Sequence, residues 1–94
     1  MDHRPSTELL ESSHSFPGVY QIKAIGSAEG DFPARVIDAV AEELASPGEI
    51  DYSTRETMGG RHISVTMNIT VQNAEQVRAI YARIREVAGL VFVL

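Results

Sequence analysis

The stretch HISVTMNITV, residues 62–71, alternates apolar and polar side chains over its whole length. Because successive side chains of a β-strand point to opposite faces of a sheet, this alternation predicts a strand with one dry face and one wet face. The dry face is Ile63, Val65, Met67, Ile69 and Val71, and the wet face is His62, Ser64, Thr66, Asn68 and Thr70. One solvated face is typical of an antiparallel sheet, so the flanking sequence should supply antiparallel partners.

Three further stretches have strand patterns. Gly59 and Gly60 predict the positive-φ turn of a hairpin, whose other strand is EIDYSTRETM, residues 49–58. VYQIKAIG, residues 19–26, predicts an earlier strand, and LVFVL, residues 90–94, predicts the last one.

Two segments between these strands repeat apolar residues at helical spacing. The first begins at Asp31 or Phe32 and ends at Ser46-Pro47-Gly48. Asn73 caps the second, and Gln76, three residues later, can close a capping box. The predicted apolar stripes are Phe32, Val36, Ile37, Val40, Ala41 and Leu44 in the first helix, and Val77, Ile80, Tyr81, Ile84 and Val87 in the second.

The resulting element order is β-α-β-β-α-β. With right-handed crossovers, this order predicts an α+β ferredoxin-like fold, in which a four-stranded antiparallel sheet carries two helices on one face. We expect residues 17–94 to form this single domain and residues 1–16 to form a flexible N-terminal tail.

Length and composition restrict the possible classes of protein. The 94 residues suffice for one domain, and no apolar run approaches the roughly 20 residues of a membrane helix. The N-terminus lacks the features of a signal peptide, and the absence of cysteine excludes disulfides and thiolate chemistry. We therefore expect a cytoplasmic bacterial protein with no membrane association and no cofactor.

Charge argues against nucleic acid as the main partner. The net charge is −5, and residues 1–51 carry ten acidic and three basic residues. RNA-recognition modules share the predicted fold, but they stack bases on aromatic residues of the central strands. The wet faces here offer Ser64, Thr66, Asn68, Gln21 and Lys23 instead.

Four segments resemble the YbeD-like family of small bacterial proteins of unknown function. They are FPGVYQIKAIG (16–26), GGRHISVTMNITV (59–71), AEQVRAIYARI (74–84) and VFVL (91–94), and the similarity covers roughly residues 9–94. In the family's hairpin pattern, S-K-G-N-Y-x-S-V-T, Gly60, Ser64, Val65 and Thr66 match. Gly59, Arg61 and His62 replace the family's Lys, Asn and aromatic residue. The resemblance implies a ferredoxin-like fold similar to ACT regulatory domains, and it adds no catalytic residue.

The loop before the first helix has two interpretations. In ACT-like domains the equivalent region often contacts small amino-acid ligands, which makes Ser27, Glu29, Gly30 and Asp31 candidate ligand-binding residues. The alternative is a turn followed by a helix cap. The loop lacks a phosphate-binding lysine, and its two acids would repel a phosphate.

Neither catalysis nor metal binding finds support in the sequence. His62 and Ser64 share a strand face, but residues two apart lie about 7 Å apart along a strand, too far for a nucleophile–base hydrogen bond. His3, His14 and His62 have no metal-ligand spacing. We therefore predict no catalytic residue, no metal site and no enzymatic activity.

The last predicted strand is apolar on both faces although the topology places it at a sheet edge. We expect Leu90, Phe92 and Leu94 to be covered either by Leu9, Leu10 and Phe16 or by a second copy of the chain. The first hypothesis is thus a non-catalytic, ACT-like regulatory or interaction domain that senses a small ligand or modulates a partner. If a second copy of the chain covers the last strand, this domain is a homodimer. The alternatives are an enzyme with a site at a dimer interface and a weak nucleic-acid-binding module.

Overall fold

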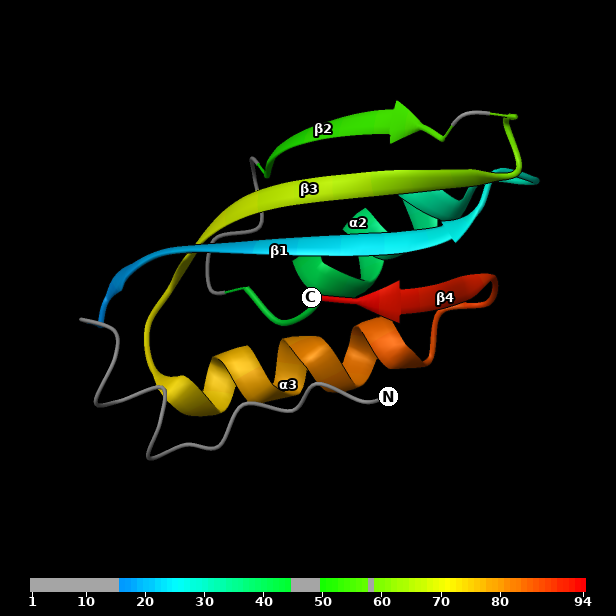
Figure 1. Ribbon diagram of the computed structural model, residues 1–94. Helices are drawn as coiled ribbons and strands as arrows, with labels where there is room; N and C mark the ends of the chain where they lie inside the picture. Colours follow the sequence, from blue (N-terminus) through cyan, green and yellow to red (C-terminus); the bar gives the residue numbers. More distant parts are fainter. Residues whose placement is uncertain (1–15, 45–49, 58) are drawn as a thin grey trace.

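The computed structural model describes residues 16–44, 50–57 and 59–94. Its elements are β1 (Gly18–Ser27), α2 (Phe32–Ala41), β2 (Asp51–Glu56), β3 (His62–Val71), α3 (Ala74–Arg85) and β4 (Leu90–Val93). The strands form one antiparallel sheet in the order β2-β3-β1-β4 (Figure 1). This arrangement confirms the predicted α+β ferredoxin-like fold. Apart from Phe16, the predicted tail of residues 1–16 lies outside the described residues.

The two central strands, β1 and β3, pair along their whole lengths. The register runs without interruption from Gly18 opposite Val71 to Ser27 opposite His62. Strand β3 has the predicted bounds, because its alternating side chains fit a sheet that is covered on one side only.

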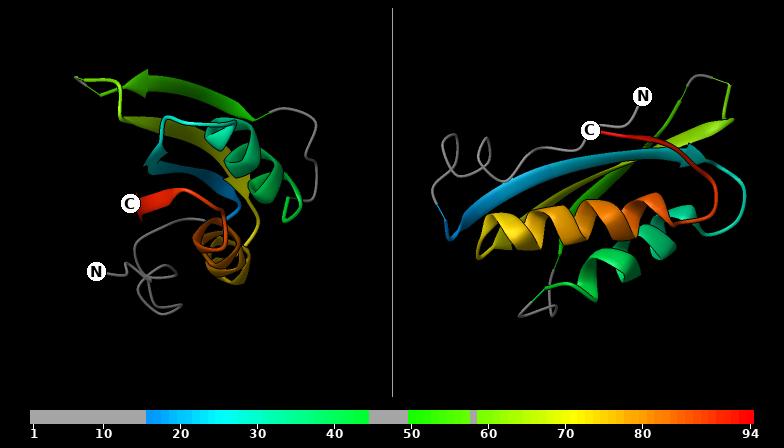
Figure 2. Two further views of the ribbon diagram at one scale, coloured as in Figure 1. Left: turned by 90° about the vertical axis from the view of Figure 1, so that its right-hand side faces the viewer. Right: turned by 90° about the horizontal axis from the view of Figure 1, so that it is seen from below.

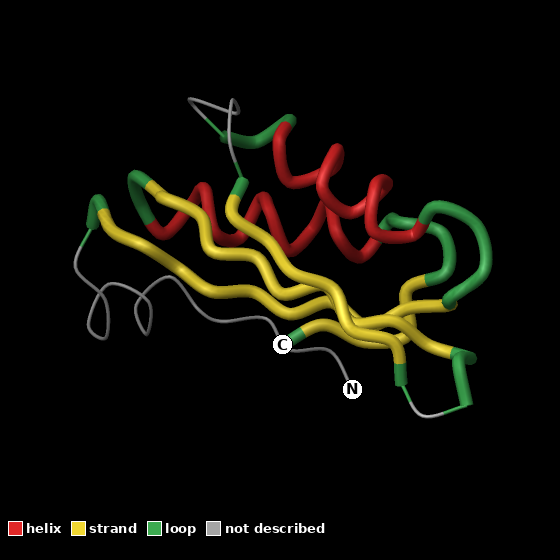
Figure 3. Tube along the Cα trace, turned by 90° about the horizontal axis from the view of Figure 1, so that it is seen from above, coloured by secondary structure: helices red, strands yellow, loops and turns green. Residues whose placement is uncertain are grey.

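Both helices lie on the same face of the sheet, and no other described element covers the opposite face, which we call the open face (Figures 2 and 3). The dry side chains of β1 and β3 point toward the helices, and burying each large one contributes about 1.5–3 kcal/mol. The fully buried core side chains include Ile22, Phe32, Val36, Val40, Val65, Met67, Val77, Ile80 and Ile84. No helix in the described part of the chain is long and apolar enough to cross a membrane.

The beginnings of the helices agree with the sequence better than their ends. Asn73 accepts a hydrogen bond from the Gln76 amide at 2.9 Å, whereas the Gln76 side chain accepts from the Gln72 amide at 2.7 Å, one residue before the expected capping-box donor. Helix α2 ends at Ala41, earlier than predicted, and the predicted stop at residues 46–48 lies outside the described residues.

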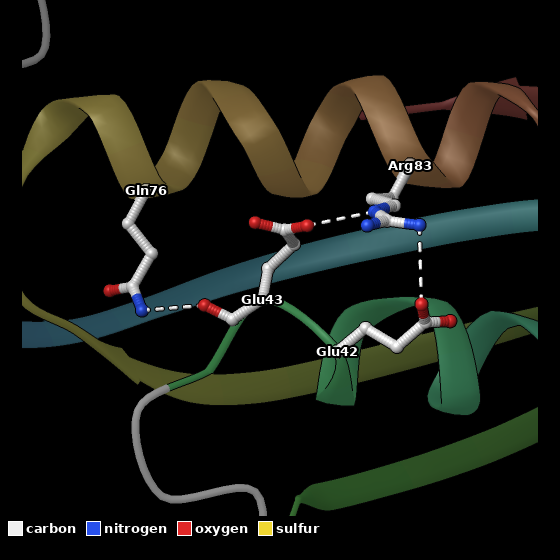
Figure 4. A network of polar contacts seen from close by, with 4 residues as sticks. All are labelled: Glu42, Glu43, Gln76 and Arg83. Atoms are coloured by element: carbon white, nitrogen blue, oxygen red, sulfur yellow. Dashed lines mark hydrogen bonds and ion pairs between the residues drawn. The ribbon is translucent and has the colours of Figure 1, made fainter.

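A polar network joins the end of α2 to α3 (Figure 4). The Arg83 guanidinium donates to the Glu43 carboxylate at 2.7 Å and forms an ion pair with Glu42 at 3.2 Å. The Gln76 side-chain amide donates to the Glu43 carbonyl oxygen at 2.8 Å. The hydrogen bond that Arg83 donates to Glu43 is the main reason that the pKa of Arg83 is raised, so this network favours the charged form of the guanidinium.

Strand β1 ends where its backbone passes directly over a buried ring. A Cβ atom on Gly26 would lie only 2.4 Å from the Phe32 ring, which is fully buried at the start of α2. Glycine at this position therefore lets the end of β1 and the start of α2 approach closely, and this approach fixes where the connecting loop begins.

Replacing Gly26 should expose this constraint. We expect Gly26→Ala to lower the free energy of unfolding by about 1–3 kcal/mol through overpacking against Phe32. In a Phe32→Leu background, the same change should cost at least about 1 kcal/mol less, because the ring is gone. Urea unfolding of the four proteins of this cycle measures the coupling. An equal loss of unfolding free energy in both backgrounds would mean that the Phe32 ring is not the reason that position 26 requires glycine.

Candidate functional site

The two groups of residues singled out from the sequence meet at one corner of the sheet. Strand β1 ends at Ser27, whose amide donates to the Gly89 carbonyl oxygen at 2.9 Å. Gly89 directly precedes β4, so the loop of residues 27–31 and the start of the edge strand are in contact. We call this region, comprising residues 27–31 and 86–94, the β4 corner.

The loop within this corner is a tight, exposed turn. The Glu29 amide donates to the Ser27 hydroxyl at 3.2 Å, and Gly30 has a positive φ of 72°. Asp31 is the N-terminal residue flanking α2, but its side chain makes no capping hydrogen bond. Glu29, Gly30 and Asp31 are exposed, so the loop presents two carboxylates to solvent.

A cation that the sequence interpretation missed lies against this loop. The Arg35 guanidinium, from the first turns of α2, donates to the Ala88 carbonyl oxygen at 3.2 Å. Its terminal nitrogens lie next to Gly30 and Gly89, where a Cβ would be at ordinary contact distance, 3.4 Å and 3.7 Å, so the positive φ of the two residues, and not the guanidinium, favours glycine there. Arg35 thereby links the loop to the turn before β4.

A β-bulge divides the residues predicted to share one face of β4. Leu90 pairs with Gly26 and Phe92 pairs with Ile25, so Val91 is an extra residue on the edge strand. Leu90 consequently lies on the helix side and packs against the core, which corrects the predicted alternation of Leu90, Phe92 and Leu94. Phe92 lies on the open face, opposite Ile25.

The edge strand is nevertheless the most apolar exposed segment of the corner. The exposed fractions are 60% for Val91, 45% for Phe92 and 49% for Leu94. Residues 87–94 contain no charged side chain. Exposed apolar edges of this kind favour pairing with another strand.

Backbone hydrogen-bonding groups are also available along this edge. Leu94 exchanges two hydrogen bonds with Lys23, at 2.8 and 3.3 Å. In an antiparallel strand, neighbouring residues direct their N–H and C=O groups to opposite sides, so those of Val93 point away from β1. The Val93 side chain, by contrast, is buried under the helices.

The open face of the sheet is polar along its two central strands. The Gln21 side chain donates to the Asn68 side chain at 3.1 Å. The Ser64 hydroxyl donates to the Arg55 carbonyl oxygen at 3.4 Å, so its hydrogen bond goes to backbone rather than to His62. Within the described ranges, no three His, Cys, Asp or Glu residues are grouped as a metal ion would require.

A groove of about 970 Å³ lies at the other end of β1, between α2 and the start of β2. Ile37, Asp38, Ile50 and Tyr52 are among its lining residues. The residues that line the groove do not include any of the β4 corner. No site is assigned to it.

Comparison with known proteins identifies relatives over nearly the whole chain. The family model described as "Protein of unknown function (DUF493)" matches residues 11–94. "UPF0250 protein" of Shewanella piezotolerans is 36% identical over 87 residues, covering 93% of this chain and 92% of the relative. The UPF0250 protein of Shewanella halifaxensis has the same identity and coverage, and one of Vibrio vulnificus is 29% identical over 85% of this chain and 80% of the relative.

Removing the Arg35 contact should loosen the β4 corner without unfolding the domain. We expect Arg35→Ala to speed amide hydrogen exchange at Ser27 about fivefold, corresponding to the loss of about 1 kcal/mol of local stability. The urea midpoint should stay nearly constant, because the side chain is exposed. Arg61→Ala, in the exposed hairpin turn, is the matched control and should leave the Ser27 rate unchanged. Equal Ser27 rates in Arg35→Ala and the wild type would contradict the linking role.

Proposed function

The chain belongs to the DUF493 family of proteins of unknown function, and from its own surface we propose that it is a non-catalytic interaction domain that pairs with a second copy of itself through β4. This membership confirms the resemblance to the YbeD-like family. The family gives no activity, so the proposal depends on the β4 corner. A cytoplasmic location, expected from the sequence, stays a prediction.

One observation carries the proposal: an apolar strand at the sheet edge exposes both side chains and backbone groups. Val91, Phe92 and Leu94 are each about half exposed or more. The outward N–H and C=O groups of Val93 have the geometry to extend the sheet. Soluble proteins usually protect such an edge with charged side chains, prolines or covering segments, and residues 87–94 contain neither a charged side chain nor a proline.

A second copy of the chain fits this edge. Two β4 strands can pair antiparallel about a two-fold axis, which places each apolar side chain against the same patch on the partner. Each chain carries a net charge of −5, so two copies repel each other at long range. An uncharged edge lets them meet where that repulsion is weakest.

The proposal of a non-catalytic role has support from the open face. A serine nucleophile needs a base within hydrogen-bonding reach, and the Ser64 hydroxyl instead donates to the Arg55 carbonyl oxygen. His62 lies two positions away on the same strand, opposite Ser27. These contacts favour a structural use of the polar face over acyl-transfer chemistry.

Small-ligand sensing is the second candidate function, because loop 27–31 contacts the turn that leads into β4. The bond from the Ser27 amide to Gly89 and the contact from Arg35 to Ala88 join the two segments. A small amino acid bound at Gly30 would therefore alter the position of the pairing edge. This is the kind of regulation that the ACT-like resemblance implies.

The pairing proposal predicts the effect of adding a charge to the edge. Light scattering after size exclusion, at a chain concentration of about 0.5 mM, should give the mass of a dimer for the wild type, since 0.5 mM detects even weak association. Val91→Lys should give the monomer mass, because it places a charged side chain on the pairing edge of each copy. Val19→Lys is the matched control: Val19 is 74% exposed at the far end of β1, and this variant should remain dimeric.

A truncated chain tests whether the N-terminal residues are the occupant of the edge instead. The protein from Ser15 onward should dimerise like the full chain. If both are monomers, the pairing proposal fails. If only the truncated chain dimerises, residues 1–14 compete for the edge, and a second copy is not its occupant in the full-length protein.

The sensing proposal predicts a thermal shift with a free amino acid. A ligand that binds only the folded state should raise the Tm by about 2–5 °C at saturating concentration. Gly30→Val, at φ +72°, should abolish the shift by distorting the loop, whereas Gly59→Val, at φ +94° in the hairpin turn, should retain it. The absence of a shift with all twenty amino acids would argue against sensing at this loop.

A further inference from the structure

The basic side chains of this acidic protein are unevenly paired. Arg83 contacts two carboxylates just after the end of α2, and Arg35 donates to a backbone carbonyl oxygen. Across the described residues, by contrast, no carboxylate oxygen lies within 4.0 Å of a side-chain nitrogen of Lys23, Arg55 or Arg61. These three belong to the sheet and its hairpin, not to the helices.

Two of these cations lie on the open face of the sheet, at the half nearer the hairpin. Lys23 is opposite Thr66, and Arg55 is opposite Ser64. Strand β3 lies between the strands that carry the two cations, so Lys23 and Arg55 are two strands apart across the sheet. Their partners Thr66 and Ser64 are two residues apart on β3, so the cations are also two residues apart along the strand direction. With strand spacings of about 4.8 Å and about 6.8 Å per two residues, their Cα atoms are about 12 Å apart.

Apolar side chains lie beside these cations on the same face. Phe92 is opposite Ile25, and Leu94 is hydrogen-bonded through its backbone to Lys23. Phe92 and Leu94 are 45% and 49% exposed. This half of the open face is therefore amphipathic, with an apolar strip at the β4 edge and basic side chains farther in. We call it the open-face patch: Lys23, Ile25, Arg55, Thr66, Phe92 and Leu94.

We propose that the open-face patch binds an extended polypeptide segment that alternates acidic and apolar residues. This inference rests on the interaction role proposed above and names the class of partner. In an extended chain, residues four positions apart lie on the same side and about 13 Å apart, close to the spacing of Lys23 and Arg55. Carboxylates at such positions meet both cations, and apolar side chains pack on Phe92 and Leu94.

Charge complementarity favours an acidic polypeptide over a nucleic acid. The chain as a whole is acidic, so a long phosphate backbone would be repelled beyond the patch. On the open face, the central strands carry no aromatic residue on which single-stranded RNA could stack, because Tyr20 of β1 lies on the helix side, and Phe92 lies on the edge strand. A short acidic segment needs only the patch itself.

Fluorescence anisotropy with a labelled alternating Glu-Leu octapeptide tests this proposal on the full chain. The wild type should bind with a Kd below about 100 µM, and raising the salt from about 50 to 300 mM should weaken binding several-fold. Lys23→Glu/Arg55→Glu should weaken it at least about tenfold, because two attractive contacts become repulsive. Both side chains are exposed, so the fold should persist, and urea unfolding checks this.

The matched control places equal negative charge on the helix side. Ala34→Glu/Ala82→Glu changes exposed residues of α2 and α3 and should bind the octapeptide almost as well as the wild type. The proposal is overturned if the wild type does not bind, if Lys23→Glu and Arg55→Glu have no effect, or if a Lys-Leu octapeptide binds equally well. Tighter binding of single-stranded oligo-dT would replace the polypeptide with nucleic acid.

Failure of this inference is separable from failure of the pairing proposal. The light-scattering mass depends on Val91 at the edge, whereas the anisotropy depends on Lys23 and Arg55 on the open face. A monomer that binds the octapeptide refutes pairing alone, and a dimer that does not bind it refutes the open-face inference alone.

Discussion

The ladder between β1 and β3 is the constraint on which the other features depend. Its uninterrupted pairing fixes which side chains face the helices, and a slip of one residue would move Val65 and Met67 into solvent. With one face committed to the core, both helices must cover that face, and the other face stays open (Figure 2). The same ladder ends at Ser27, and this end point brings the following loop against the turn before β4.

The fold was predictable because its pattern is local and redundant. Strand β3 shows its alternation in sequence, and Asn73 marks the start of α3. The bulge in β4 was not predictable, because LVFVL is apolar at every position and therefore does not indicate which residues face the core. The bulge places Leu90 on the core side, opposite Gly26, through a pairing between residues more than sixty positions apart. No pattern within a short window records such a pairing.

The candidate site was predictable only in parts. The sequence singled out residues 27–31 and the last strand separately, and their contact follows from the topology of the sheet. Arg35 was missed, because an arginine on an exposed helix face is ordinary until the opposite turn is known to lie within its reach. Whether a carboxylate of the described residues pairs with Lys23 or Arg55 likewise depends on where those carboxylates lie in space. The sequence indicated that both basic residues lie on wet strand faces, but it did not indicate which carboxylates lie close to them.

The two edges of the sheet differ in a way that limits growth. All six residues of β2 are exposed, and they include the charged residues Asp51, Arg55 and Glu56. A sheet whose two edge strands could both pair with other copies could add copies edge to edge without limit, as fibrils do. Here the charged edge would resist such addition, and the proposed pairing through β4 would use up the apolar edge of both copies at once. Assembly by that pairing would therefore close at two copies, which gives a means of association without a route to polymerisation.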